Sequence, residues 1–172
     1  SVADLVICSS KATERDLLRF SPQVTSKVIY LGGNNRFHQP VSRSAKSRLV
    51  KQLQLPKQFV LFVGTVEPRK NLPRLLTAYR RLDRKLQSAY PLLLAGKLGW
   101  NYQPVLAFMA REGWKMANVV GQPVRYLGFV DDADLAVLYR LATSLVYPSL
   151  FEGFGFPPLE AMQSGLPVVV SR

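Results

Sequence analysis

The pattern of apolar and polar positions predicts strands and helices that alternate along most of the chain. The continuous apolar run at residues 59–63 (FVLFV) is typical of a parallel strand that is buried on both faces. Residues 72–86 instead carry leucine and tyrosine at helical spacing, which predicts an amphipathic helix. By the same criteria, the predicted strands are residues 4–9, 27–31, 59–63, 92–95, 124–129, 145–147 and 167–170. The predicted helices are residues 11–20, 44–53, 72–86, 105–112 and 135–142.

The order of these elements defines the expected fold class. From residue 59 onward, strands and helices alternate with short connections, which predicts an α/β fold with a doubly wound parallel sheet. A length of 172 residues is sufficient for one domain with a sizeable core. Ligands in such folds gather where the parallel strands end, so the loops that follow strands are the candidate sites.

Basic residues exceed acidic residues and are concentrated in one part of the chain. The formal net charge is +12, and residues 17–66 contain no Asp or Glu. Such a segment would attract polyanions, namely nucleic acid, anionic lipid or phosphorylated substrates. A solvated basic face explains the same pattern equally well. The basic residues of this segment are Arg19, Lys27, Arg36, Arg43, Lys46, Arg48, Lys51 and Lys57.

Other features of the sequence narrow the function classes. No apolar run approaches the roughly 20 residues that a membrane-spanning helix needs. The single cysteine, Cys8, excludes an internal disulfide, is compatible with the cytosol and is expected to be a buried strand thiol. No His, Cys and Asp spacing predicts a metal site, and no G-x-S-x-G nucleophile turn is present.

The first candidate site is the loop at residues 64–71 (GTVEPRKN), between a buried strand and a helix. Gly64 permits close approach of a ligand, and Arg69 or Lys70 can neutralise a phosphate. The sequence is neither G-x-G-x-x-G nor a Walker A motif, so a dinucleotide site or P-loop has no support. A capping loop with exposed basic residues remains the alternative.

The second candidate is the segment at residues 151–162 (FEGFGFPPLEAM). Its glycines and Pro-Pro pair predict a loop that opens a helix, and a helix N-terminus favours anions. Glu160 is expected near the first turn of that helix, with Glu152 in the loop before it. A weaker third candidate is the turn at residues 128–131, where Asp131 is expected to cap a helix. Three loops at three strand ends of one sheet can form a single crevice.

The runs VGTVEPRKNLPRLLTAY and YLGFVDDADLAVLYRLATSLVYPSLFEGFGFPPLEAMQSGLPVVVS resemble the C-terminal, donor-binding domain of family 4 retaining glycosyltransferases. These enzymes have the GT-B fold, in which two Rossmann-like domains face a cleft. The resemblance covers residues 59–172. It implies that residues 1–40 link from an absent N-terminal domain. Residues 41–172 would form the donor-binding domain, truncated at its C-terminal end.

The resemblance implies transfer of a sugar from a nucleotide-diphosphate sugar, with retention and without a metal or other cofactor. The acceptor would be a glycan or a lipid-linked sugar in cell-surface polysaccharide biosynthesis, and the EPRKN motif favours mannose. The implied location is the cytoplasm, with peripheral contact at the inner face of an anionic membrane as a further partner. No nucleic acid is expected as a partner. Without the N-terminal domain, the isolated chain is expected to be inactive.

The resemblance also assigns roles to individual residues. Lys70 would bind the donor diphosphate, Glu152 would lie by the donor sugar, and Glu160 would bind the ribose hydroxyls; Lys70 and Glu152 are the expected catalytic pair. Many members carry an arginine at the position of Thr65, so Arg69 is a candidate substitute. The remaining implied donor contacts are Gly64, the backbone of Gly128, Phe129 and Val130 beside the base, and the backbone of Gly153, Phe154 and Gly155.

Two alternatives to the enzyme compete on the sequence alone. A domain with the nucleotide-sugar fold could act as a non-catalytic binding partner or membrane-surface partner through its basic segment. A basic nucleic-acid-binding protein would account for the charge, but it leaves the glutamate-containing loop unexplained.

Overall fold

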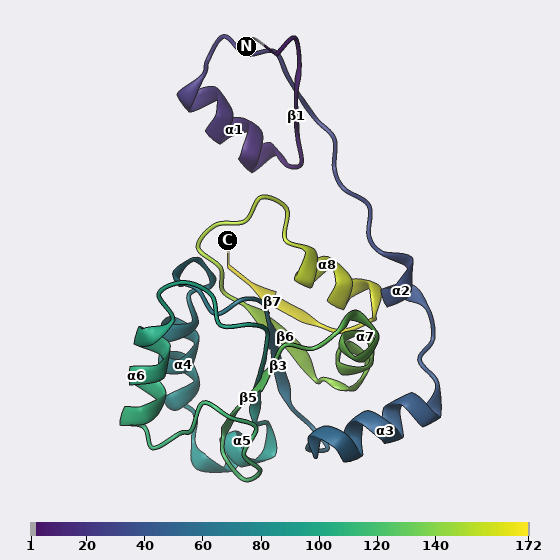
Figure 1. Ribbon diagram of the computed structural model, residues 1–172, viewed down its shortest axis with the longest axis vertical. Helices are drawn as coiled ribbons and strands as arrows, with labels where there is room; N and C mark the ends of the chain where they lie inside the picture. Colours follow the sequence, from purple (N-terminus) through teal and green to yellow (C-terminus); the bar gives the residue numbers. More distant parts are fainter. Residues whose placement is uncertain (1–2, 172) are drawn as a thin grey trace.

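A computed structural model describes residues 3–171 and shows a five-stranded parallel sheet with helices on both faces (Figure 1). The strand order is β5-β4-β3-β6-β7, and every neighbouring pair is parallel. This confirms the predicted doubly wound α/β fold. The strands are β3 (Val60–Val63), β4 (Leu92–Ala95), β5 (Val124–Gly128), β6 (Ser144–Tyr147) and β7 (Val168–Val170).

The helices cover the two faces of this sheet in separate groups. In Figure 1, α4 (Leu72–Arg80) and α6 (Gln103–Arg111) lie on one side, and α7 (Asp132–Leu141) and α8 (Phe156–Gln163) lie on the other. The helix α3 (Arg43–Leu53) packs against α7, and α5 (Arg84–Ala89) follows α4. All four residues of β4 are buried, as expected for a strand covered on both faces.

The direction in which strands are added reverses next to β3. The chain proceeds from β3 outward to β4 and β5, and then returns to place β6 on the other side of β3. In open α/β sheets this reversal is the topological switch point, where the loops after two adjacent strands separate and leave a crevice. The carboxyl ends of β3 and β6 are therefore the expected location of a ligand.

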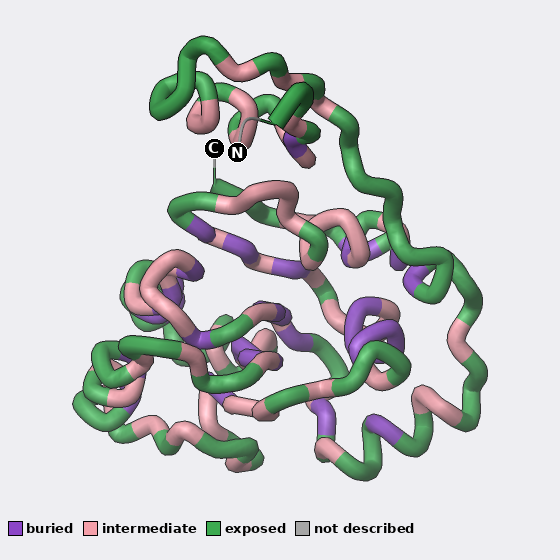
Figure 2. The backbone as a smooth tube through the Cα atoms, turned by 45° about the horizontal axis from the view of Figure 1, so that its top comes forward, coloured by how far each residue is buried: buried purple, intermediate pink, exposed green. Residues whose placement is uncertain are grey.

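The first part of the chain forms a small separate unit. The strands β1 (Val6–Cys8) and β2 (Ser26–Val28) pair in parallel, with α1 (Lys11–Phe20) between them. Cys8 is 2% exposed, which confirms the predicted buried strand thiol. Figure 2 shows that most buried residues lie in the main body and few in this unit. The predicted domain boundary at residue 40 stays a prediction.

Several element boundaries differ from the sequence predictions. The predicted single helix at residues 72–86 is wrong: α4 ends at Arg80, and Asp83 starts α5 by accepting a hydrogen bond from the Leu86 amide at 2.8 Å. An aspartate favours an N-cap over a helix interior, and this local preference outweighs the apolar spacing. The strand expected at residues 27–31 ends at Val28, after which the side chains are exposed.

A short helix, α2 (Asn35–His38), was not predicted. Asn34 caps it by accepting a hydrogen bond from the Arg36 amide, which satisfies a free N–H group at the start of the helix. Phe37 is 2% exposed, and α2 packs against α7 and α8. The helix therefore anchors the connecting segment to the main body.

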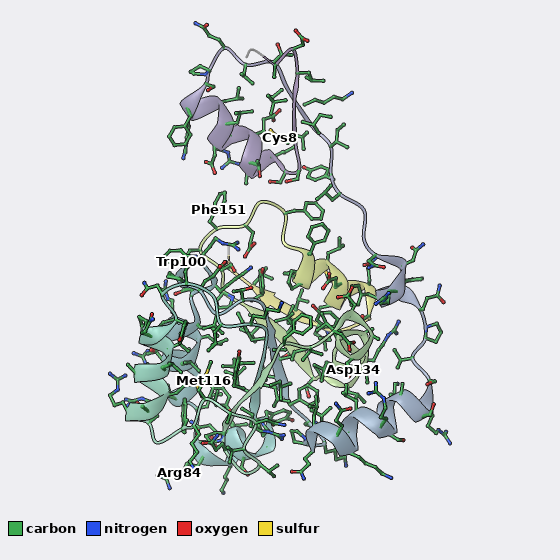
Figure 3. The ribbon with its side chains drawn as sticks, viewed as in Figure 1. Cys8, Arg84, Trp100, Met116, Asp134 and Phe151 are labelled. Atoms are coloured by element: carbon green, nitrogen blue, oxygen red, sulfur yellow. The ribbon has the colours of Figure 1, made fainter. Side chains whose placement is uncertain are left out.

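Aspartates on α7 neutralise part of the positive charge of residues 17–66. Arg36 pairs with Asp132 at 3.7 Å, and Arg48 pairs with Asp134, which Figure 3 labels at the start of α7. Acidic residues in the first turn of a helix also complement its dipole. Some of the positive charge at residues 17–66 therefore serves the fold. Across residues 3–171, no helix combines the length and the apolar character that crossing a bilayer requires.

The substitution Asp83→Ala tests the helix break between α4 and α5. Loss of this N-cap is expected to lower the free energy of unfolding by about 1 kcal/mol. Urea unfolding followed by circular dichroism measures the change. Asp4→Ala, which removes an exposed aspartate outside any helix, is the control. An unchanged midpoint for Asp83→Ala would show that α5 does not depend on this cap.

Candidate functional site

The loops after β3 and β6 are tied together at the switch point. Because β3 and β6 pair directly, their carboxyl ends meet at the same edge of the sheet. The Leu150 amide donates a hydrogen bond to the Arg69 carbonyl at 2.9 Å, and Asn71 Nδ2 donates to the Pro148 carbonyl at 3.1 Å. The first and second candidate segments thus form one structural unit.

Four side chains from these loops form what we term the Glu152 cluster: Arg69, Lys70, Tyr147 and Glu152. Lys70 Nζ lies 2.7 Å from Glu152 Oε1, and Arg69 Nη1 lies 2.6 Å from Glu152 Oε2. Tyr147 Oη donates to Glu152 Oε1 at 2.8 Å and accepts from Lys70 Nζ at 2.5 Å. Lys70 is only 7% exposed, so its charge depends on these partners.

The cluster is electrically balanced. Arg69 also contacts Glu67 Oε1 at 2.7 Å and donates to the Phe151 carbonyl at 3.0 Å. Two cations, Arg69 and Lys70, therefore face two carboxylates. The pKa of Arg69 is raised, because these carboxylates outweigh its partial burial.

Glu152 stays ionised throughout the physiological pH range. Burial alone would raise its pKa, but hydrogen bonds from Lys70, Tyr147 and Arg69 oppose burial and contribute to a pKa of about 2. Burial and the neighbouring carboxylate raise the pKa of Tyr147, so its phenol stays protonated. The carboxylate therefore acts only as a hydrogen-bond acceptor.

Two glycines shape the ends of β3 and β4. Gly64 has a φ of 149°, which L side chains rarely adopt, while a Cβ atom there would make an ordinary contact of 3.4 Å with Lys70 Cε. At Gly96, a Cβ atom would lie 2.0 Å from the Gly64 carbonyl oxygen, so no side chain fits. Gly64 had been predicted as a site residue; Gly96 had not.

A hollow of about 240 Å³ opens at the ends of β3, β4 and β5. Gly64 lines it and also borders Lys70 of the Glu152 cluster. Gly64, Thr65, Phe129 and Val130, which were predicted as donor contacts, line it. Gly128 ends β5 and accepts a hydrogen bond from the Gly96 amide at 2.7 Å. The lining residues that were not predicted include Gly96, Asp132 and Lys97, whose Nζ lies 4.6 Å from the Phe129 ring centroid.

Glu160 lies on α8, which starts at Phe156 directly after Gly155. It is the fifth residue of the helix and thus lies just beyond the first turn, close to the predicted position. Glu160 Oε2 accepts a hydrogen bond from Tyr139 Oη of α7 at 2.9 Å. Burial, followed by the charge of Asp132, raises the Glu160 pKa despite this hydrogen bond.

The loop between the two glutamates contacts the N-terminal unit. Ser9 Oγ and Thr13 Oγ1 both donate to the Gly153 carbonyl, at 3.3 and 3.1 Å. Phe154 and Phe156 pack edge to face with centroids 5.4 Å apart, as expected for phenylalanines that support the loop. In Figure 3, Phe151 lies at the edge of the main body that faces the N-terminal unit.

The structure thus brings most predicted site residues to one edge of the sheet, although it does not test their roles. Sequence reasoning missed Tyr147, because in the run LVYPSL it occupies an ordinary apolar strand position. Its place as the last strand residue before the loop was the one available signal.

The five-stranded parallel sheet with helices on both faces matches the Rossmann-like domains of GT-B glycosyltransferases. A UDP-glucose complex of Anabaena Alr3699/HepE superposes with a TM-score of 0.77 and 25% identity, covering 98% of this chain and 44% of that one. WaaG, a glycosyltransferase involved in lipopolysaccharide biosynthesis, shares the fold with a TM-score of 0.76 and 19% identity, over 95% of this chain and 43% of its own.

Residues 44–172 match the family "Glycosyl transferases group 1", and the chain belongs to this family. It is similar to the O-antigen chain mannosyltransferase B of Escherichia coli, with 44% identity over 128 residues and 72% of this chain. It is also similar to the serotype-specific mannosyltransferase WbdA of Escherichia coli, with 31% identity over 167 residues and 95% of this chain. The chain spans 31% and 20% of the length of these relatives.

The substitution Glu152→Gln tests the energetic role of the cluster. The folded-state pKa of about 2 lies below the ordinary value of 4.5, so the carboxylate stabilises the fold above about pH 4.5 and loses this effect as pH falls towards 2. We expect the variant to lose about 2–3 kcal/mol of unfolding free energy near pH 7. The difference from wild type should shrink as the solution is acidified.

Urea unfolding at a series of pH values measures this effect. Asp16→Asn is the control, because the pairing of Asp16 with the exposed Arg19 at 3.6 Å is expected to contribute little. A pH-independent difference between Glu152→Gln and wild type would contradict the assignment.

Proposed function

We propose that this chain is the donor-binding part of a retaining glycosyltransferase that transfers mannose from a nucleotide-diphosphate sugar to a glycan or lipid-linked acceptor. The observation that carries the proposal is the Glu152 cluster, which places two cations and a carboxylate at the switch point beside an open hollow. Family membership and the similarity to O-antigen mannosyltransferases support it.

In this proposal, Lys70 and Arg69 bind the donor diphosphate. Both are held within hydrogen-bond distance of the same carboxylate, so a diphosphate at that point would contact both cations. Their charge would stabilise the negative charge that develops on the departing diphosphate. Arg69 thereby supplies the second cation that other members place at the position of Thr65.

Glu152 would then accept hydrogen bonds from the donor sugar. A diphosphate that engages Lys70 and Arg69 leaves the carboxylate with fewer partners, while Tyr147 still holds Oε1. The backbone amides of residues 153–155 precede α8, and the N-terminus of this helix favours the sugar-phosphate end of the donor. Retention and independence from metal ions are parts of the proposal.

The hollow lined by Phe129 and Val130 is the proposed base site, and Glu160 is the proposed ribose contact. Thr65 and Gly64 line the side nearer to Lys70.

The acceptor contacts and the complete reaction are proposed for the longer protein, since relatives are several times the length of this chain. The chain by itself is expected to bind the donor without transferring the sugar. We place the protein in the cytoplasm, with peripheral contact at the membrane where a lipid-linked acceptor would lie.

The substitution Lys70→Met tests the diphosphate site. We expect the affinity for UDP and GDP to fall about 10- to 100-fold, because one charge-assisted hydrogen bond is lost. Affinity for uridine and guanosine, which lack phosphate, should remain unchanged. Arg69→Met is expected to behave in the same way, and titration calorimetry measures all four ligands.

Lys85→Met is the matched control, because Lys85 is an exposed lysine on α5. Equal losses for nucleoside and nucleoside diphosphate would place Lys70 away from the phosphates. Absence of UDP and GDP binding to the wild-type chain at millimolar concentration would overturn the proposed function.

A further inference from the structure

We propose that Tyr139 is a positioning residue for Glu160: its hydroxyl fixes the carboxylate that recognises the ribose of the nucleotide sugar. The inference rests on the proposed function, because it takes the ribose role of Glu160 as its starting point. It adds a residue outside the loops, on the buried face of α7.

The contact is direct and selective for one carboxylate oxygen. Tyr139 Oη donates to Glu160 Oε2 at 2.9 Å, and Tyr139 is 1% exposed. Within residues 3–171, no hydrogen bond to Glu160 Oε1 is formed, and Glu160 has no ion-pair partner. One oxygen is therefore fixed by the protein, and the other is left for a hydroxyl donor.

The ring of Tyr139 is itself held in place by α2. Phe37 packs edge to face on it, with centroids 5.5 Å apart and an interplanar angle of 75°. The Phe37 carbonyl accepts hydrogen bonds from Ser164 Oγ at 3.1 Å and from Arg140 Nη2 at 3.3 Å. With its ring packed and its backbone neighbours fixed, the phenol has little freedom to leave Glu160.

The surroundings of Glu160 make this hydroxyl important. The negative charge of Asp132, at the start of α7, helps to raise the Glu160 pKa, and Asp132 pairs with Arg36 of α2 at 3.7 Å. Tyr147 of β6 also lies near Tyr139, and both phenols are protonated because burial raises the pKa of each. In contrast to Glu152, Glu160 depends on a neutral donor rather than on cations.

Loss of the hydroxyl should change both the orientation and the protonation of Glu160. Burial raises the Glu160 pKa, whereas the Tyr139 hydrogen bond lowers it. Without that hydrogen bond the pKa rises further, so the carboxylate is protonated at a higher pH. A protonated or rotated Glu160 accepts ribose hydroxyls less well.

The test compares Tyr139→Phe with wild type in the 172-residue chain. Affinities for UDP and GDP, and for their 2′,3′-dideoxy analogues, are measured by titration calorimetry over a range of pH. We expect Tyr139→Phe to weaken binding of the preferred diphosphate about 10-fold near neutral pH. The variant should also lose most of the wild-type preference for the natural ribose over the dideoxy form, and its acid limit of binding should move to higher pH.

Two further variants separate positioning from general packing. Tyr79→Phe removes another buried hydroxyl, on α4, which lies within hydrogen-bond distance of the carbonyls of Pro123 and Tyr90. This variant should leave the ribose preference and the pH profile of binding unchanged. In a Glu160→Gln background, Tyr139→Phe should cause little further loss of affinity.

The outcomes distinguish the inference from the proposed function. If wild type binds neither UDP nor GDP, the proposed function fails and the inference fails with it. If wild type binds but Tyr139→Phe keeps the same ribose preference and the same pH profile, the positioning role alone is overturned, whether or not overall affinity falls. An unchanged circular dichroism spectrum shows that the variant is folded. If such a variant has lost the ribose preference and its pH profile has shifted, the inference is supported.

Discussion

The Glu152 carboxylate accepts hydrogen bonds from Lys70, Arg69 and Tyr147, and through them the loops after β3 and β6 are held together. A nearly buried lysine and a carboxylate are costly to desolvate, so each requires the other. The cluster can exist only because β3 and β6 are neighbours at the reversal of strand order. A ligand with more negative charge than Glu152 would use the same cations, so structural and binding roles compete for one set of contacts.

The two glutamates of the 151–162 segment have opposite electrostatic environments, although each accepts a hydrogen bond from a tyrosine hydroxyl. Cations hold the pKa of Glu152 low, whereas burial without a cation raises the pKa of Glu160. The first carboxylate is therefore insensitive to pH near neutrality and is already engaged. The second retains an unoccupied oxygen among the described contacts, which suits an acceptor of neutral hydroxyls.

Local sequence signals predicted most of the fold, because buried strands and capped helices leave strong patterns. The strand at residues 92–95 and the helix at residues 11–20 have the predicted boundaries, and Asp131 caps α7 as expected. The sequence also indicated which loops meet at one edge of the sheet, because each of them directly follows a predicted parallel strand. Tyr147 was missed because it looks like a core residue of an apolar strand. That Arg69 and Lys70 share one carboxylate could not be predicted, because these contacts join positions more than 80 residues apart.

The first 40 residues reach the candidate site at two separate points. The N-terminal unit contacts the loop between the glutamates through the Gly153 carbonyl, whereas α2 supports Glu160 through Phe37 and Tyr139. Between these points, residues 29–34 are exposed. The sugar end and the ribose end of the proposed donor site thus contact different parts of the first 40 residues.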